Sequence, residues 1–412
     1  MKQVLHEHRR VITSGPAGAV ILGLALSAVG DSAARVALVL GAHDGGSGTG
    51  GLAVLLMVLA LPTVLLVGVS GRLASSLDVR PALLTATVLQ IGSAVYLSQV
   101  DGSLATLVGA ALLQGGYAAA SSAWLVSLPR LAPAELSGAV MSLQQALLGI
   151  ATPCGAALGG LLFAVGRGAP FVLDAISFAP LLGLCLLIPP RPSRETTTGS
   201  NTSVRKTLLP LDGLAALRGQ RVLARLIGFV LLFIITIESV NAVEVFLVRD
   251  TLGATAAQFG ATEAAAGIGV VIGALGSSAV SGTRARIRAF VLLLSAVAAA
   301  QLTQGLAPSV GIYLGLAVVV GTLMGAINTI LMTLLVTATD LRTRGAVVAL
   351  VGGAARASST AALAVGGILG TVATPRLAFV VVGTTGMVIG IAASILVRTA
   401  QTGESPELKK RN

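Results

Sequence analysis

The chain is a series of long apolar segments separated by short polar breaks, and this pattern runs from Val11 to Val397. Each apolar segment is close to the ~20 residues that a helix needs to cross a hydrocarbon core ~30 Å thick. The segments are continuously apolar, whereas the strands of a transmembrane barrel alternate polar and apolar residues over about ten positions. The pattern therefore predicts membrane-spanning helices, which satisfy their own backbone hydrogen bonds within lipid.

Twelve such segments predict an all-α polytopic membrane protein with twelve transmembrane helices in two six-helix bundles. The composition agrees, because 55% hydrophobic and 10% charged residues are far from the values of a soluble domain. The approximate spans are 16–40, 52–70, 81–99, 104–128, 137–164, 171–188, 222–247, 259–280, 289–306, 310–337, 346–373 and 376–397.

An internal repeat divides the chain into two halves. The segment SGAVMSL at 137–143 recurs as RGAVVAL at 344–350, an offset of 207 residues, and ALGG at 157–160 recurs as AVGG at 364–367 with the same offset. We expect one bundle over 1–188, a cytoplasmic linker over 189–221, and a second bundle with a short cytoplasmic tail over 222–412. Parallel repeats of this kind place a substrate site between the halves, near the membrane midplane.

Basic residues collect on one side of the predicted membrane. If the N-terminus is cytoplasmic, 22 of the 27 Lys and Arg residues lie inside, three (Arg167, Arg249 and Arg376) lie outside, and two lie within spans. This distribution predicts a multi-pass protein of the inner (cytoplasmic) membrane with both termini in the cytoplasm. The net charge of +11 then favours contact with anionic lipid, and its dispersal over many loops argues against a nucleic-acid partner.

The N-terminus also resembles a signal peptide, since basic residues precede the apolar stretch Ala17–Val29. The apolar run resumes at Val36–Leu40, and removal of this segment would break the repeat. We therefore interpret it as the first transmembrane helix.

The sequence has no motif for catalysis. It contains no phosphate-binding loop, no G-x-S-x-G elbow and no paired metal ligands, and its two cysteines lie singly in apolar spans. We expect no enzyme activity, no metal and no cofactor. The expected partners are a small-molecule substrate, protons and membrane lipid, and the expected state is a monomer.

Five short segments carry a resemblance to a known family: GD at 30–31, GRLASSLDVR at 71–80, GAALGG at 155–160, FVLDAISF at 171–178 and VRDTLG at 248–253. They resemble the major facilitator superfamily, in its drug:proton antiporter-like branch that includes macrolide and enterobactin exporters. Two positions depart from that pattern, because Ser75-Ser76 and Gly155-Ala156 stand where the family has Asp-Arg and Gly-Pro. The resemblance implies transport by rocking of two bundles, with spans 1, 4, 7 and 10 around a central cavity.

Ionisable groups within the spans are the first candidates for function, because each costs roughly 2.5–3.5 kcal/mol at the membrane centre. Asp31 and Arg35 are four residues apart and share a helix face. One interpretation is an ion pair that lowers the cost of insertion. The other is that Asp31 couples transport to protons, since a carboxylate in a cavity of low dielectric holds a proton more readily than one in water.

The repeat relates Asp31 to Glu238 by the same offset of 207 residues. These two acids are our proton-coupling candidates. Asn241 is expected to share a face with Glu238, and Arg356 is a candidate for holding an anionic group or a cavity carboxylate. We expect Asp174, Glu244 and Glu263 to lie near the outer ends of their spans, where water can solvate them.

Polar and aromatic side chains form a stripe on span 4. Gln114, Tyr117, Ser121 and Trp124 recur at helical spacing, and Asn328 belongs to a weaker stripe on span 10. Such a surface suits a mostly apolar ligand that needs a few hydrogen bonds, although Trp124 is also a candidate for an interfacial aromatic belt. The sequence thus favours proton-coupled efflux of a small apolar compound, such as an antibiotic or a secondary metabolite, with uptake of a metabolite as the alternative.

Overall fold

The computed structural model describes residues 16–76, 79–186, 221–339 and 344–403, together with residues 8 and 10–12 near the N-terminus. The predicted linker up to residue 220 and the tail from residue 404 lie outside the described residues. The side chains of residues 66–78 lie outside them too, and with them most of the loop between spans 2 and 3.

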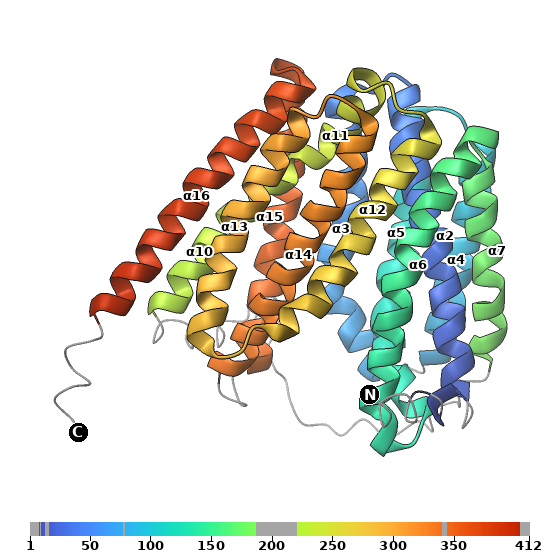
Figure 1. The fold of residues 1–412 in the computed structure, drawn as a ribbon. Helices are drawn as coiled ribbons and strands as arrows, with labels where there is room; N and C mark the ends of the chain where they lie inside the picture. The colour runs from blue at the N-terminus through green and yellow to red at the C-terminus, as the bar shows by residue number, and fades with distance from the viewer. Residues whose placement is uncertain are drawn as a thin grey trace. The chain divides into compact units, whose positions relative to one another are not determined.

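The part of the chain that the structure describes is helical throughout, as the continuous apolar segments predicted (Figure 1). The helices of the first half are α2 (Pro16–Asp44), α3 (Gly48–Ser76), α4 (Val79–Gln99), α5 (Ser103–Ser127), η1 (Leu128–Leu131), η2 (Ala134–Leu136), α6 (Ser137–Val165) and α7 (Ala169–Cys185). Those of the second half are α10 (Arg221–Glu238), η3 (Ser239–Ala242), α11 (Glu244–Phe246), η4 (Leu247–Thr251), α12 (Ala256–Gly276), η5 (Ser277–Ala279), α13 (Thr283–Gly305), α14 (Val310–Ala338), α15 (Arg344–Val372) and α16 (Pro375–Gly403).

Each of the twelve predicted spans has a helical counterpart among the described residues. In the part of the chain that the structure describes, nine helices are long and apolar enough to cross a membrane, and a bent pair in span 7 makes a tenth. The fully described part of α3, Gly48–Thr63, and α7 are apolar but shorter. The all-α class with membrane-spanning helices is therefore confirmed.

The repeat reappears in the bounds of the helices. Helix α6 ends at Val165 and α15 ends at Val372, so these two ends keep the offset of 207 residues. The sequence match at 137 and 344 therefore marks equivalent helices and not a chance similarity.

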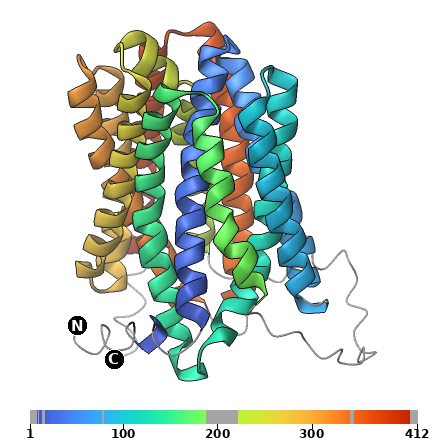
Figure 2. The same cartoon turned by 90° about the vertical axis from the view of Figure 1, so that its right-hand side faces the viewer.

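The chain packs as two compact units. The first comprises Met1–Asn201 with Ala254–Gly267, and the second comprises Thr202–Gly253 with Ile268–Asn412. In the first unit α2 runs between α6 and α7 and packs against both (Figure 2). Helix α2 is thus central to its unit, and its polar residues are enclosed by neighbouring helices.

Small residues at four-residue spacing let helices approach closely within each unit. Gly155 and Gly159 of α6 lie against α2, and a Cβ atom added at Gly159 would be only 2.7 Å from the Ala33 Cα atom. In the second unit Gly269 and Gly273 of α12 lie against the backbone of α14. In both units the closest helix contacts are thus made without side chains, as small-residue interfaces in membranes allow.

Candidate functional site

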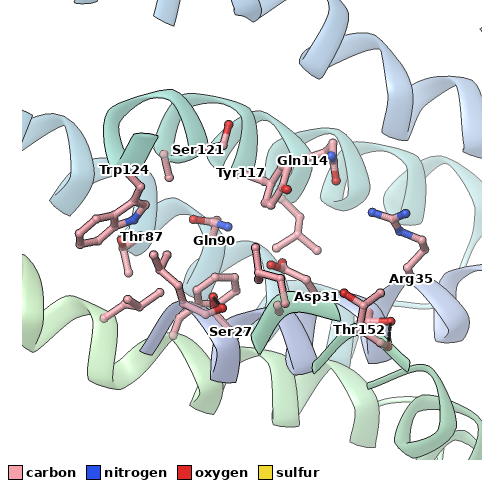
Figure 3. A pocket seen from close by; sticks show the side chains of 18 of the residues that line it. Ser27, Asp31, Arg35, Thr87, Gln90, Gln114, Tyr117, Ser121, Trp124 and Thr152 are labelled. Atoms are coloured by element: carbon pink, nitrogen blue, oxygen red, sulfur yellow. Dashed lines mark hydrogen bonds between the residues drawn. The ribbon is translucent and has the colours of Figure 1, made fainter. Parts of the chain in front are cut away.

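A cavity of about 260 Å³ lies inside the first unit, among helices α2, α4, α5, α6 and α7 (Figure 3). Its wall is mostly apolar, with leucines from several helices and Phe178 from α7. Six of the side chains singled out in the sequence line it: Asp31, Arg35, Gln114, Tyr117, Ser121 and Trp124. Residues from two separate predicted spans are therefore brought to one enclosed space.

The charged part of the cavity comes from α2, where Asp31 is half-buried and Arg35 is exposed to the cavity. The two charges interact electrostatically. Among the described residues, however, the two side chains do not form a direct ion pair. Arg35 is thus near enough to interact electrostatically with the Asp31 carboxylate, but it does not form an ion pair with it.

The opposite wall is the predicted stripe of α5. Figure 3 shows its four side chains along one helix, with Gln114, Tyr117 and Trp124 towards the cavity, while the Ser121 hydroxyl donates to the Ala118 carbonyl of its own helix. Trp124 is buried, with 4% of its surface exposed, while Tyr117 is 41% exposed. Helical spacing alone placed these four residues on one face, and the packing of α5 turns that face inward.

Further polar groups of the cavity were not singled out from the sequence. Thr87 and Gln90 of α4, Gln144 and Thr152 of α6, and Ser27 of α2 also line it. The Gln144 Oε1 atom is buried, and no partner for it is present among the described residues. Each of these residues is an uncharged polar residue in an apolar span. Such a residue indicates a functional site less strongly than an ionisable one does.

In the second unit, span 7 is broken where the sequence predicted a continuous helix over 222–247. Helix α10 ends at Glu238, the 3-10 helix η3 follows, and α11 and the π-helix η4 continue to Thr251 with a bend of 45°. The prediction from the sequence missed the bend because it interrupts a segment that is long and apolar overall, although Ser239, Asn241 and Glu244 make the residues of the break more polar than α10. The break depends on tertiary contacts: the Gln301 Nε2 atom donates to the Ile237 carbonyl at 3.3 Å, and Gly366 lies against the Ser239 carbonyl.

Two acidic side chains flank this break. Glu238 is half-buried, with the Ser359 hydroxyl of α15 within hydrogen-bonding range of its carboxyl group. The Tyr313 hydroxyl of α14 donates to the Glu244 Oε1 atom at 2.7 Å. Glu244 is half-buried and held by this side chain, so its carboxyl group is engaged within the bundle. Neither Tyr313 nor Ser359 was expected from the sequence, because each lies outside the charged positions and the polar stripes that were singled out there.

The remaining predicted residues of the second unit lie apart on different helices. Asn241 is in η3, Asn328 is on α14 and Arg356 is on α15, and all three are exposed. Residues three apart share a side in a 3-10 helix, so η3 is compatible with the expected shared face of Glu238 and Asn241, and the 45° bend follows only after Ala242. The assignment of these three residues to a substrate cavity stays a prediction.

The sequence matches the model of a known protein family. The model of the Major Facilitator Superfamily matches residues 20–300, which is more than half of the chain. The chain belongs to the major facilitator superfamily. A comparison with curated protein sequences gives no match.

Solved structures of the superfamily have the same fold. The nucleoside transporter NupG is 12% identical, with a TM-score of 0.70 over 92% of this chain and 99% of that chain. A bacterial homologue of the iron transporter ferroportin in an inward-facing state is 14% identical, with a TM-score of 0.69 over 92% and 98%. The human organic anion transporter MFSD10 is 16% identical, with a TM-score of 0.63 over 94% and 99%.

Membership of the superfamily, shown by the family model, identifies the molecule as a multi-pass membrane transporter and not an enzyme. The substrates in the names of the three structures differ widely, from nucleosides to iron to organic anions. At these low identities the matches establish the fold alone. The substrate must be inferred from the side chains of this chain.

Proposed function

We propose that this member of the superfamily is a proton-coupled exporter of a small, largely apolar compound, such as an antibiotic or a secondary metabolite, and works by alternating access. The observation that carries the proposal is the cavity of the first unit, where an apolar wall holds one acid, one base and a few hydrogen-bonding groups. Ligand pockets are typically apolar with a few polar groups that fix orientation, and begin at roughly 300 Å³. The aromatic side chains of α5 supply contact area for such a ligand.

Proton coupling is assigned to Asp31 and Glu238, which occupy equivalent positions of the two halves by the repeat. Both side chains are half-buried and neither forms a direct ion pair among the described residues. An intramembrane acid that is not neutralised by a base is a functional group by default, because its insertion is costly. Arg35, Gln114, Tyr117, Ser121 and Trp124, with Asn241, Asn328 and Arg356 of the second unit, are assigned to the substrate.

We assign the transporter to the inner membrane with both termini in the cytoplasm, from the distribution of its basic residues. Single cysteines introduced at Ser47, between α2 and α3, and at Ser137, at the start of α6, check this orientation in a variant without its own cysteines. An impermeant maleimide added to intact cells is expected to label the Ser47 position and not the Ser137 position. Labelling of Ser137 alone would reverse the assignment.

Expression in a drug-sensitive host tests the export proposal. We expect higher tolerance and lower accumulation of apolar compounds from a panel that includes macrolides and the dye ethidium. Trp124→Ala should reduce the effect about tenfold, because an aromatic contact of roughly 1.5 kcal/mol is lost from the cavity. Leu112→Ala is the matched control, since Leu112 is an exposed residue of the same helix and does not line the cavity.

The panel also separates export from its alternative. Increased accumulation of a compound would indicate uptake by the same fold. Unchanged tolerance and unchanged accumulation across many chemical types would contradict the export proposal.

A further inference from the structure

Asp174 of α7 is a buried acid that the transport site described above does not use. Its side chain is 0% exposed, and among the described residues neither carboxyl oxygen has a hydrogen-bond partner. The Ser177 hydroxyl, one turn along the helix, donates to the Asp174 backbone carbonyl at 2.7 Å instead. Asp174 lies near the start of α7, as expected for a residue near one end of its span, but its side chain is not exposed to water as was expected from the sequence, because it packs against α2.

The contact with α2 brings Asp174 next to Asp31. A Cβ atom added at Gly30 would be 2.7 Å from the Asp174 Oδ1 atom and would also meet the Ser177 hydroxyl. Only a glycine at this position lets the carboxyl group lie against the α2 backbone. Asp31 is the next residue, and its charge acts on Asp174.

The other helices packed against α7 bring few charges to this position. Helices α2, α4 and α6 contact α7. Besides Asp31, α2 carries Arg35 one turn further along, while α4 has Arg80 and Tyr96 near its two ends and α6 has only Cys154 as a titratable group. An ionised Asp174 would thus face Asp31 with no base beside it, which is a costly arrangement in a membrane.

Asp174 also lies between two cavities on α7. Phe178, about one turn towards the end of the helix, lines the cavity that contains Asp31. Phe171, about one turn towards its start, lines a second cavity of about 750 Å³. That cavity is formed by the end of α2 and the start of α3, and by the ends and starts of α4, α5, α6 and α7 at the same side of the unit. Leu38 of α2 borders both cavities.

We propose that Asp174 is a proton-carrying partner of Asp31, reached by water from the second cavity. In the transfer step the O–H bond of the neutral Asp174 acid breaks as an O–H bond to the Asp31 carboxylate forms, directly or through one water molecule. The Asp174 carboxylate then regains a proton from a hydronium ion that enters from the second cavity, and the hydronium ion becomes water. The step conserves charge and needs no other reactant, and it deepens the proposed proton coupling by giving Asp31 a route for protons within the first unit.

Infrared difference spectroscopy of the purified transporter tests the protonation part without any substrate. Wild-type protein at neutral pH is expected to show a protonated-carboxyl C=O band that is lost in Asp174→Asn and kept in Ser177→Ala, the matched control from the same helix face. The Asp31 carboxylate should appear at a different pH in Asp174→Asn than in wild type, because asparagine cannot carry the charge of the neighbouring carboxyl group. An unchanged band, or an unchanged Asp31 titration, would overturn the proposal. This result does not depend on whether the protein transports protons, so it is separate from a failure of the proposed function.

Transport in proteoliposomes tests the partner role. With ethidium as the probe, Asp174→Asn should slow uptake driven by a pH gradient about a hundredfold and leave ethidium exchange without a gradient within about twofold. Wild-type rates under the gradient would overturn the proposal. If Asp174→Asn does not purify as a folded protein, Asp174→Glu, which keeps the acid, should fold and retain coupling, and loss of coupling in that folded variant would count equally against a relay.

Discussion

Asp31→Asn is expected to abolish transport driven by a pH gradient and to leave substrate exchange partly intact. Asparagine keeps the size and hydrogen bonding of the side chain in the cavity, but it cannot bind or release a proton. A positioned acid or base typically contributes a hundredfold or more to a proton-dependent step, so gradient-driven rates should fall by about that factor. The measurement is ethidium transport into proteoliposomes with and without an imposed gradient, with Ser27→Ala as the control within the same cavity.

The double variant Asp31→Asn with Arg35→Gln distinguishes coupling from charge neutralisation. If Asp31 only balances Arg35, removing both charges should restore much of the lost transport, since an unpaired buried charge is worse than an absent pair. The structure favours the other outcome, because the two side chains interact at a distance and do not form a direct ion pair among the described residues. We therefore expect no rescue. Rescue by the double variant, or full gradient-driven transport by the single one, would remove Asp31 from the coupling assignment.

The helices could be predicted from the sequence because lipid enforces a simple relation between apolar length and span. The same relation explains why the stripe of α5 was found: four polar or aromatic residues at helical spacing in an otherwise apolar segment are easily seen. Its direction could not be derived, since which face of α5 turns towards Asp31 depends on packing with α3 and α4. The structure adds that information and brings the stripe to the acid.

Two features could not be predicted, and both depend on contacts between distant parts of the chain. The first feature is the burial of Asp174. Its own segment is apolar like the other spans, and its burial depends on Gly30 of another helix, which has no side chain to keep the carboxyl group away. The break after Glu238 depends on Gln301 of α13 and Gly366 of α15, which are more than 60 residues away in the sequence. The polar periodicity of a single span contains neither fact.

The break changes how Glu238 should be tested. Discontinuous helices in transporters place helix ends, with their free backbone groups, at substrate and ion sites near the midplane. Glu238 is the last residue of α10, so its carboxyl group is at such an end, while Glu244 beyond the break is held by Tyr313. Glu238 also has a hydroxyl group nearby, that of Ser359, but of the two acids only Glu244 accepts a direct hydrogen bond of 2.7 Å among the described residues. Glu238 is therefore the more available to a ligand or a proton, and Glu244 serves as a matched acid with a structural partner.

Glu238→Gln is expected to change selectivity according to the charge of the substrate. A hydrogen bond to a charged group contributes about 1.5–3 kcal/mol, so its loss should weaken binding of a cationic probe by about tenfold to a hundredfold. Ethidium is the cationic probe and Nile red the uncharged one, and their affinities for the purified variant are measured by fluorescence. We expect ethidium affinity to fall and Nile red affinity to stay within about threefold, a difference below 1 kcal/mol.

Glu244→Gln, as the control acid, should change both affinities equally or not at all, because any effect would pass through the Tyr313 contact and not through ligand charge. Equal losses for both probes in Glu238→Gln would show that Glu238 holds the break in place, and the assignment of Glu238 to the substrate and proton site would then be wrong.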